Sequence, residues 1–514
     1  MIIGTLSSKI SRLEPGGLII AEFALAAFVA ANVCDPDFFW HLKAGRWIVE
    51  NGALPSHDVF SFTRPDAPWV LHEWLFEVVL DRIDALAGIT GVRALVASCL
   101  GATFAVTYRS LRDRLDPGPA LWIGVGCFAA MLFFAAPRPQ LITYLFFAIY
   151  LHRVLAFLRE GRARWLYALP FIMVVWVNSH AGYVMGLAVL MIACAGVTAE
   201  QWIAHANSAR LRPLLICLMT TAGASLVSPY HILHWAYPFM AAGMEATRMI
   251  QEWRPPELGD PGFLFFLVLI AAWGWTLSAR SGRPPATELA LAAAMTLLSL
   301  KAIRHLPFGL LTVAPLLAQG LAAGALARAR AWWSSSALSA AYRRRVAGGK
   351  PIGSGVHAVN WALLAGSVLV ASQALPAWAE RQHEQSNWAT GWKAVDFIAA
   401  RGLSGRMFNE YGFGGLLIYR LYPAQKVFID GRADAYGDAF VKEYNKITWG
   451  DEGWQEAFDR YAIDYVVCPR NRPLRQLLLQ RGDFAQVYAD KDNAVLVKRS
   501  PRYDALIRAA TAGP

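Results

Sequence analysis

Two carboxylates and a histidine lie close together in the segment CDPDFFWHLK, residues 34–43. Asp35 and Asp37 are two residues apart, and His41 follows Asp37 at helical spacing, directly after a long apolar stretch. Paired carboxylates can hold a hard divalent cation such as Mg²⁺ or Mn²⁺, for which Asp37 would be the ligand. Alternatively, one carboxylate acts as a general base on an incoming nucleophile. The spacing also fits a structural role, in which Asp35 caps a helix that begins at Pro36.

Other polar side chains stand at the ends of apolar stretches and form a second group of candidates. A guanidinium suits bidentate contacts with phosphate, whereas amide and imidazole groups can hydrogen-bond a sugar. Interfacial snorkelling and hydrogen-bonded core packing are the structural alternatives for these residues. The candidates are Arg138, Arg304 and His305 for a phosphate, Asn178 and His180 for a sugar, and His41, Glu73, Glu252 and Arg254 as further groups facing a substrate.

The composition indicates a polytopic α-helical membrane protein. Of 514 residues, 56% are hydrophobic and 17% are charged, against about 25% charged residues in soluble domains. The net charge of +11 comes from short basic clusters between apolar stretches, which is the positive-inside pattern and argues against nucleic-acid binding. The six cysteines include no C-x-x-C pair, so neither a zinc site nor a disulfide framework is predicted.

Apolar length predicts about eleven transmembrane helices, followed by a C-terminal region with the composition of a soluble α/β domain. In that region we expect a helix at 392–402, strands at 426–430 and 465–469, and a hairpin at 487–499. The predicted domains are therefore a bundle, 1–380, and an α/β domain, 381–514. The predicted spans are 17–34, 92–110, 120–136, 139–157, 165–179, 183–203, 211–227, 262–278, 286–303, 305–325 and 358–376.

Charge in the loops predicts the orientation of these spans. With the N-terminus in the cytoplasm, every predicted cytoplasmic loop is basic, including the loop at 326–357. An odd number of spans then places the C-terminal domain outside. The polar candidates fall on that same side and predict a polar cavity that opens outward. Residues 35–90 form the first outer loop, whose part at 69–88 has the pattern of an amphipathic helix lying on the membrane.

The first outer loop resembles that of the GT-C membrane glycosyltransferases, and most of all the catalytic subunit of oligosaccharyltransferases. Archaeal members begin this loop with D-P-Y-Y-H-L-R, and Asp37 to Lys43 match that run in order, with Phe38 for proline and Lys43 for arginine. A D-P-F-T-like turn follows at 58–63, and HEWLFE at 72–77 resembles a W-x-P-L-like element. More weakly, FNEYGFGG at 408–415 resembles their W-W-D-Y-G block without its tryptophans.

The resemblance implies a GT-C-like bundle and a donor sugar carried on a polyprenyl phosphate or diphosphate. In that family the acid of the first loop lies at the metal and acceptor site, which identifies Asp37, with Asp35 as the alternate. The family's second acidic motif is absent, and Asp58, Glu73 or Glu252 are the candidates to replace it. Near the weaker match, Asp430, Arg432 and Asp434 could instead form a salt-bridged turn.

The expected function is transfer of a sugar from such a donor to an acceptor at the outer face of a bacterial inner membrane. The C-terminal domain would then be periplasmic, and the partners would be the lipid-linked donor, membrane lipids and an acceptor of unknown class. Three alternatives stay open: a ligase that moves a whole lipid-linked glycan, a transporter, and a non-catalytic assembly protein. The ionisable groups stand at span ends rather than at mid-span, which argues against the transporter.

The predicted orientation can be tested with reporter fusions. Fusions at Ala340 and at Gly450 should give opposite signals, because the first lies in the predicted cytoplasmic loop and the second in the outer domain. Equal signals from the two fusions would contradict both the orientation and the outward-facing cavity.

Overall fold

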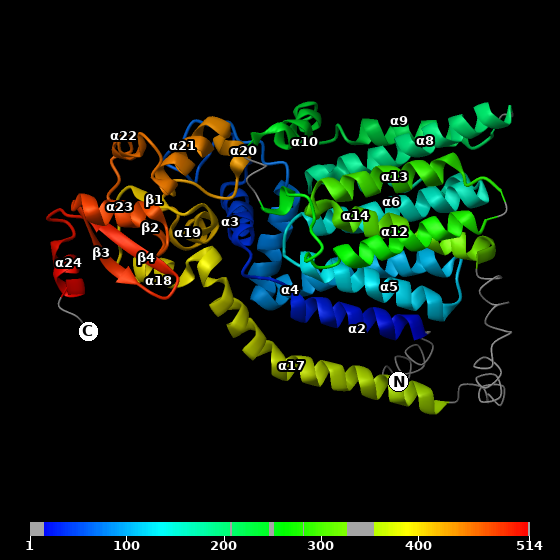
Figure 1. Cartoon of the computed structure of the whole chain (residues 1–514), viewed down its shortest axis with the longest axis horizontal. Helices are drawn as coiled ribbons and strands as arrows, with labels where there is room; N and C mark the ends of the chain where they lie inside the picture. Colours follow the sequence, from blue (N-terminus) through cyan, green and yellow to red (C-terminus); the bar gives the residue numbers. More distant parts are fainter. Residues whose placement is uncertain (1–14, 206–207, 246–250, 281, 326–353, 512–514) are drawn as a thin grey trace.

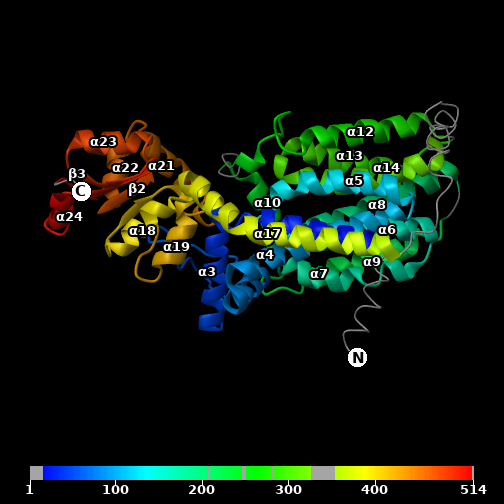
Figure 2. The same cartoon turned by 90° about the horizontal axis from the view of Figure 1, so that it is seen from below.

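The computed structural model describes residues 15–205, 208–245, 251–280, 282–325 and 354–511, so most of the predicted loop at 326–357 lies outside the described residues. The chain forms a long helical bundle with a smaller sheet-containing domain at one end (Figure 1). The helix α3, Pro36–Asn51, lies between the two parts in both views (Figures 1 and 2).

A helix covers each of the predicted apolar stretches, because these sequences are apolar over lengths that only a helix can bury with its backbone satisfied. Short 3₁₀ helices cap several of them at the end nearer to the C-terminal domain. The elements are α2 Pro15–Ala30, α4 Trp74–Arg112, α5 Pro117–Met131, η1 Leu132–Phe134, α6 Gln140–Glu160, η2 Ala163–Trp165, α7 Leu169–Val177, η3 Ala181–Tyr183, α8 Val184–Ala204, α9 Leu211–Ala224, α10 Leu233–Gly243, η4 Gln251–Trp253, α12 Phe263–Ser278, α13 Ala286–Lys301, η5 Ile303–His305, α14 Leu306–Gly320, η6 Leu321–Ala325 and α17 Ser354–Thr390.

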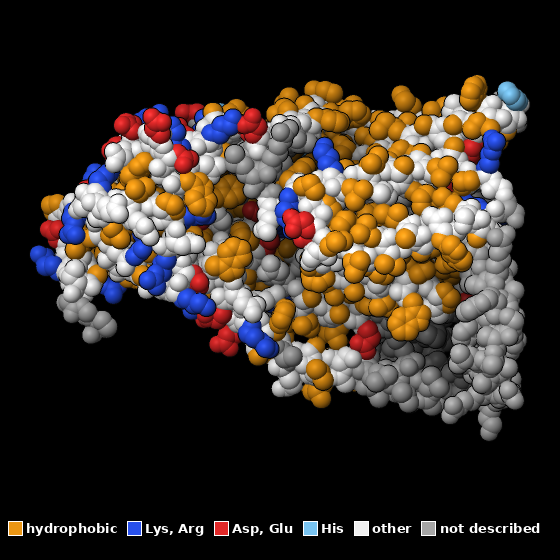
Figure 3. Space-filling model, in the orientation of Figure 1, with side chains coloured by type: hydrophobic (Ala, Val, Ile, Leu, Met, Phe, Trp, Pro, Cys, Tyr) orange, Lys and Arg blue, Asp and Glu red, His pale blue; other side chains and the backbone are white. Residues whose placement is uncertain are grey.

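Four helices among the described residues are long and apolar enough to cross a membrane by themselves: Trp74–Arg112, Gln140–Glu160, Ala181–Ala204 and Ile303–Ala323. Shorter apolar helices accompany them, and the count of about eleven spans stays a prediction. On the face shown in Figure 3, apolar side chains cover most of the bundle, whereas charged side chains are frequent on the C-terminal domain. This distribution is that of a bundle embedded in lipid.

The first outer loop begins with α3, whose ends follow from its sequence. Asp35 is the N-cap and accepts a hydrogen bond from the N–H of Asp37, Pro36 occupies the first turn, and Gly52 ends the helix in the left-handed conformation. Gly45 packs against α4 so closely that a Cβ there would lie 2.0 Å from the carbonyl oxygen of Glu77. The absence of a side chain at Gly45 therefore sets the approach of α3 to α4.

The predicted amphipathic helix at 69–88 is present from Trp74 as the first part of α4. Gly88, at φ 56°, interrupts the helical geometry and separates this part from the apolar remainder of α4. Glu77 and Asp81 of the first part are buried between protein elements. Their burial shows that this polar face is packed against the protein rather than exposed to water.

The C-terminal domain is an α/β layer structure. Its sheet has the order β1-β2-β4-β3, with β1 parallel to β2 and the other pairs antiparallel. Alternate residues of β2 face opposite sides: Tyr465 and Val467 belong to the apolar core that includes α18 and part of the first outer loop, whereas Val466 and Cys468 belong to the core that includes α21 to α23. The elements are α18 Trp392–Ala400, β1 Met407–Asn409, η7 Tyr411–Phe413, α19 Gly414–Leu421, α20 Ala433–Tyr436, α21 Asp438–Trp449, α22 Trp454–Arg460, β2 Tyr465–Pro469, α23 Pro473–Arg481, β3 Phe484–Ala489, β4 Asn493–Lys498 and α24 Asp504–Thr511.

Three of the four elements predicted in this domain are confirmed, namely α18, β2 and the hairpin of β3 and β4. The predicted strand at 426–430 is wrong. Val427 makes only an isolated bridge with Ser61, and the N–H of Phe428 donates to the side-chain oxygen of Asn409 at 2.8 Å. The side chain of Asn409 thus makes a hydrogen bond that the backbone of a neighbouring strand would make in a sheet. The predicted domain boundary at residue 380 falls inside α17, which runs along α2 and continues into the C-terminal domain (Figure 1).

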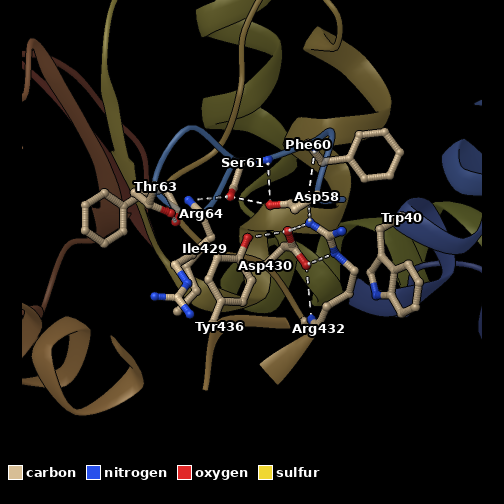
Figure 4. Close-up of polar contacts among 12 residues, drawn as sticks. Trp40, Asp58, Phe60, Ser61, Thr63, Arg64, Ile429, Asp430, Arg432 and Tyr436 are labelled. Carbon is tan, nitrogen blue, oxygen red and sulfur yellow. Dashed lines mark hydrogen bonds and ion pairs between the residues drawn. The ribbon is translucent and has the colours of Figure 1, made fainter. Parts of the chain in front are cut away.

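A buried ion group fastens the first outer loop to the C-terminal domain (Figure 4). The guanidinium of Arg432 donates to Asp430 at 2.7 and 2.8 Å and lies 2.9 Å from Asp58 of the first loop. The rings of Phe60 and Trp69 lie over the same guanidinium, at 5.2 and 4.4 Å from their centroids. The predicted ion pair of Asp430 and Arg432 is confirmed. Asp434, the third predicted member of this turn, lines the cavity instead, and the second acid of the group, Asp58, comes from a segment far away in the sequence.

Removing this buried cation should destabilise the protein. Arg432→Met leaves two buried carboxylates without their partner, and we expect a loss of about 3–5 kcal/mol in the free energy of unfolding. The control is Arg420→Met, which breaks a half-exposed pair with Asp396 and should cost less than about 1 kcal/mol. Thermal unfolding of both purified variants in detergent measures the difference. Equal losses in the two variants would contradict the role of Arg432.

Candidate functional site

A cavity of about 1780 Å³ lies between the ends of the bundle helices and the C-terminal domain. The bundle supplies the starts of α6, α8 and α14, the end of α13, part of α10 and the 3₁₀ helices η1, η3, η4 and η5. The first loop supplies α3 and residues 69 and 71–73, and the C-terminal domain supplies the segments around Tyr411 and Arg432. Polar contacts join these parts. The N–H of Leu75 donates to the carbonyl oxygen of Asn178 at 3.0 Å, and the hydroxyl of Tyr230 accepts from the N–H of Leu71 at 3.0 Å.

Asp37 lines the cavity, whereas Asp35 lies behind it as the cap of α3. One oxygen of Asp37 accepts from the indole N–H of Trp40 at 3.2 Å, and the other lies 2.8 Å from Arg138. Burial raises the pKa of Asp37 to about 6, against the lowering effect of Arg138. Asp37 is therefore the carboxylate of this pair that a substrate can reach.

Glu252 connects two arginines at the cavity wall. Its carboxylate lies 3.3 Å from Arg138 and 2.9 Å from Arg304. The guanidinium of Arg304 also stacks over Trp253, 4.4 Å from the ring centroid. Because Glu252 joins them, the side chains of four predicted site residues, Asp37, Arg138, Glu252 and Arg304, form one continuous chain of ion pairs.

Glu73 stands among three imidazoles on the other side of the cavity. Its oxygens lie 3.4 Å from His72, 3.6 Å from His180 and 3.7 Å from His41. Burial alone would raise the pKa of Glu73, but the adjacent His72 lowers it below its usual value. The Nδ1 atom of His180 accepts the N–H of Gly182 at 3.0 Å, so a neutral His180 carries its proton on Nε2, the atom that faces Glu73.

His41 projects from α3 one turn after Asp37 and contacts α4. Its Nδ1 atom lies 2.9 Å from an oxygen of Glu77, and burial lowers the pKa of His41 to about 3. Among the described residues, His41, Glu73 and Glu77 offer ligand atoms within 4.8 Å of one another. This arrangement is able to hold a metal ion and differs from the site at Asp37 that the sequence predicts.

The remaining predicted site residues have mainly structural contacts. Asn178 does not line the cavity; its side chain accepts from the indole N–H of Trp74 and donates to two carbonyl oxygens. Arg254 lines the cavity and is paired with Asp260, which also lines it. His305 lines the cavity beside Trp253, with ring centroids 5.6 Å apart.

Two important residues of the site were missed by the sequence analysis. Gly431 lies against Asp37, and a Cβ at this position would stand 2.1 Å from the carboxylate oxygen. Tyr411 lines the cavity above it and donates its hydroxyl to the carbonyl oxygen of Gly431 at 2.9 Å. The sequence signal for Tyr411 was its place in FNEYGFGG, the segment that resembles oligosaccharyltransferases, whereas nothing in the local pattern brings residue 431 to residue 37.

The sequence matches no protein-family model, and no curated protein matches it. Solved structures do match. An archaeal oligosaccharyltransferase, AglB from Archaeoglobus fulgidus in complex with an inhibitory peptide and a dolichol-phosphate, aligns with a TM-score of 0.52 and 11% identity, over 88% of this chain and 69% of that one. ArnT from Cupriavidus metallidurans bound to undecaprenyl phosphate aligns with a TM-score of 0.50 and 14% identity, over 94% of this chain and 97% of that one.

These alignments confirm the resemblance that the first outer loop suggested. The chain has the GT-C fold. The ArnT alignment extends over nearly the whole of both chains, so the GT-C fold includes the C-terminal domain as well as the bundle. At these identities the alignments establish the fold, whereas the roles of individual residues rest on the geometry of the cavity.

Proposed function

We propose that this chain is a membrane glycosyltransferase that moves a sugar from a polyprenyl-phosphate-linked donor to an acceptor at the outer face of a bacterial inner membrane. The observation that carries the proposal is a cavity in which a partly buried acid, Asp37, and two arginines, Arg138 and Arg304, lie within one network of ion pairs. GT-C neighbours whose structures contain dolichol-phosphate or undecaprenyl phosphate support the donor class.

Asp37 is the proposed general base. A base must be largely deprotonated at the working pH and still bind a proton in the transition state, and a pKa of about 6 meets both demands. Its oxygen at the cavity would take the proton of the acceptor hydroxyl or amide as that group attacks the sugar. Trp40 and Arg138 hold the carboxylate in one orientation during this step.

Arg304 is the proposed partner of the donor phosphate. Negative charge grows on the leaving phosphate during transfer, and a fixed guanidinium stabilises it most at that point. Arg304 is fixed by stacking on Trp253 and by its contact with Glu252, and Lys301 lines the same part of the cavity. Arg138 makes three carboxylate contacts, so its charge is used mainly to position the acids.

The size of the cavity favours a second candidate within the same class. Pockets for single small ligands measure about 300–1,000 Å³, and this cavity is larger at about 1780 Å³. A ligase that transfers a whole lipid-linked glycan would use that space. Both candidates need the same base and the same phosphate contact, and they differ in which donors the purified enzyme accepts.

Neutral replacements at the two acids test the assignment of the base. Asp37→Asn keeps the shape of the side chain and should lower the transfer rate by at least about a hundredfold. Asp35→Asn should lower the transfer rate less, because Asp35 caps α3 and accepts a hydrogen bond from the Nε atom of Arg138. Transfer is measured with a polyprenyl-linked sugar, and thermal unfolding confirms that both variants are folded. Full activity of a folded Asp37→Asn protein would refute the role of Asp37.

Binding of the lipid donor tests the assignment of the phosphate site. Arg304→Ala should weaken binding of polyprenyl phosphate by about 1.5–3 kcal/mol, the size of a charge-assisted hydrogen bond. Arg304→Lys should recover part of this loss, because it keeps the charge without the planar fork. The matched control is Arg254→Ala, an arginine that also lines the cavity but is paired with Asp260. Unchanged donor binding in Arg304→Ala would contradict the assignment.

A further inference from the structure

The guanidinium of Arg138 is surrounded by carboxylates on all of its sides. Its Nε atom donates to Asp35 at 2.6 Å, one terminal nitrogen lies 2.8 Å from Asp37, and the other lies 3.3 Å from Glu252. Three acids from two distant segments thus converge on one cation. Carboxylates converge in the same way on a divalent metal ion that binds through oxygen.

The position of this guanidinium is fixed by its own segment. Arg138 stands between Pro137 and Pro139 at the start of α6, and its N–H donates to the carbonyl oxygen of Ala136 at 2.7 Å. The N–H of Asn32 donates to the carbonyl oxygen of Ala135 at 2.7 Å, which ties this segment to the end of α2. Arg138 is therefore a built part of the site rather than a mobile surface arginine.

Five of the six oxygens of these three acids already lie against donors: Oδ1 of Asp35 and both oxygens of Asp37 and of Glu252. Besides Arg138, Asp35 accepts the N–H of Asp37, Asp37 accepts the indole N–H of Trp40, and Glu252 meets Arg304. A divalent ion would need several of these lone pairs at about 2.0–2.6 Å. It would also stand beside a permanent positive charge, because a guanidinium does not lose its proton in proteins. The acids at Asp37 therefore do not fit the metal that the resemblance implies.

We propose that Arg138 takes the place of a divalent cation at Asp35, Asp37 and Glu252, so that sugar transfer at Asp37 needs no metal ion there. Like a metal ion, the guanidinium holds the three carboxylates close together by its charge, and it orients Asp37 toward the cavity. Unlike a divalent ion, it supplies a single charge, so it leaves Asp37 more basic than a metal ligand would be. The inference rests on the proposed function, but its first test measures metal binding and needs no activity.

The test of metal binding titrates variants of the full-length protein in detergent with Mn²⁺. Electron paramagnetic resonance measures how much Mn²⁺ each variant binds. Arg138→Ala exposes the three carboxylates to one another and should gain about one bound Mn²⁺ per chain relative to the wild type. Adding Asp37→Asn to that variant should abolish the gain. Thermal unfolding establishes that the variants are folded, and a folded Arg138→Ala protein that gains no Mn²⁺ would overturn the proposal.

Two further variants, made in the wild-type background, keep the inference testable if Arg138→Ala does not fold. Mn²⁺ bound at His41, Glu73 and Glu77 should disappear in Glu77→Gln and persist in Asp37→Asn. Mn²⁺ that wild-type protein binds and Asp37→Asn loses would show that a metal occupies the acids beside Arg138, which overturns the proposal.

The activity arm measures transfer from a polyprenyl-linked sugar by the wild-type enzyme and by the Glu77→Gln variant. Transfer by Glu77→Gln should continue at the same rate with and without excess EDTA, because this variant lacks the other group of metal-binding residues. Loss of its transfer with EDTA and recovery with Mn²⁺ would contradict the role of Arg138. An enzyme that transfers no sugar under any condition would refute the proposed function instead, and the binding measurement would still decide which cation the acids hold.

Discussion

The fully buried guanidinium of Arg432 is the interaction on which the rest of the site depends. It joins Asp58 of the first outer loop to Asp430 of the C-terminal domain, beneath the rings of Phe60 and Trp69. A buried charge that loses a partner costs several kcal/mol, so the loop and the domain are held in the one relative position that keeps Asp58 and Asp430 on Arg432. That docking sets Gly431 against Asp37 and closes one wall of the cavity.

A second cation, Arg138, organises the other wall in the same physical way. It draws together the acids at the start of α3 and Glu252 near the end of the bundle, and Glu252 in turn reaches Arg304. The expected base and the expected phosphate contact are therefore coupled through charges rather than through the backbone. A substitution of Glu252 should therefore disturb both Arg138 and Arg304, because Glu252 forms an ion pair with each of them.

The sequence alone predicts features that depend on local pattern. Apolar length located the bundle helices, a short apolar stretch located β2, a turn between two strand-like stretches located the hairpin, and the cap at Asp35 followed from Asp-Pro-Asp. It could not predict which distant groups meet. The strand expected at 426–430 is absent because the side chain of Asn409 makes the hydrogen bond to that backbone that a neighbouring strand would make. Asn178 was a sugar-binding candidate, but its side chain is hydrogen-bonded to Trp74 and to two carbonyl groups. The contact of Arg138 with Asp37 likewise depends on the docking of separate helices.

The central claim is that the lipid-linked donor binds with its phosphate on Arg304, in the same cavity that Asp37 lines. A cryo-electron-microscopy structure of the full chain with polyprenyl phosphate tests it most directly. The account predicts that the phosphate contacts the guanidinium of Arg304, that the prenyl chain leaves the cavity toward the apolar bundle surface, and that Asp37 remains on Arg138. A phosphate bound elsewhere, with Arg304 still held by Glu252 alone, would contradict it.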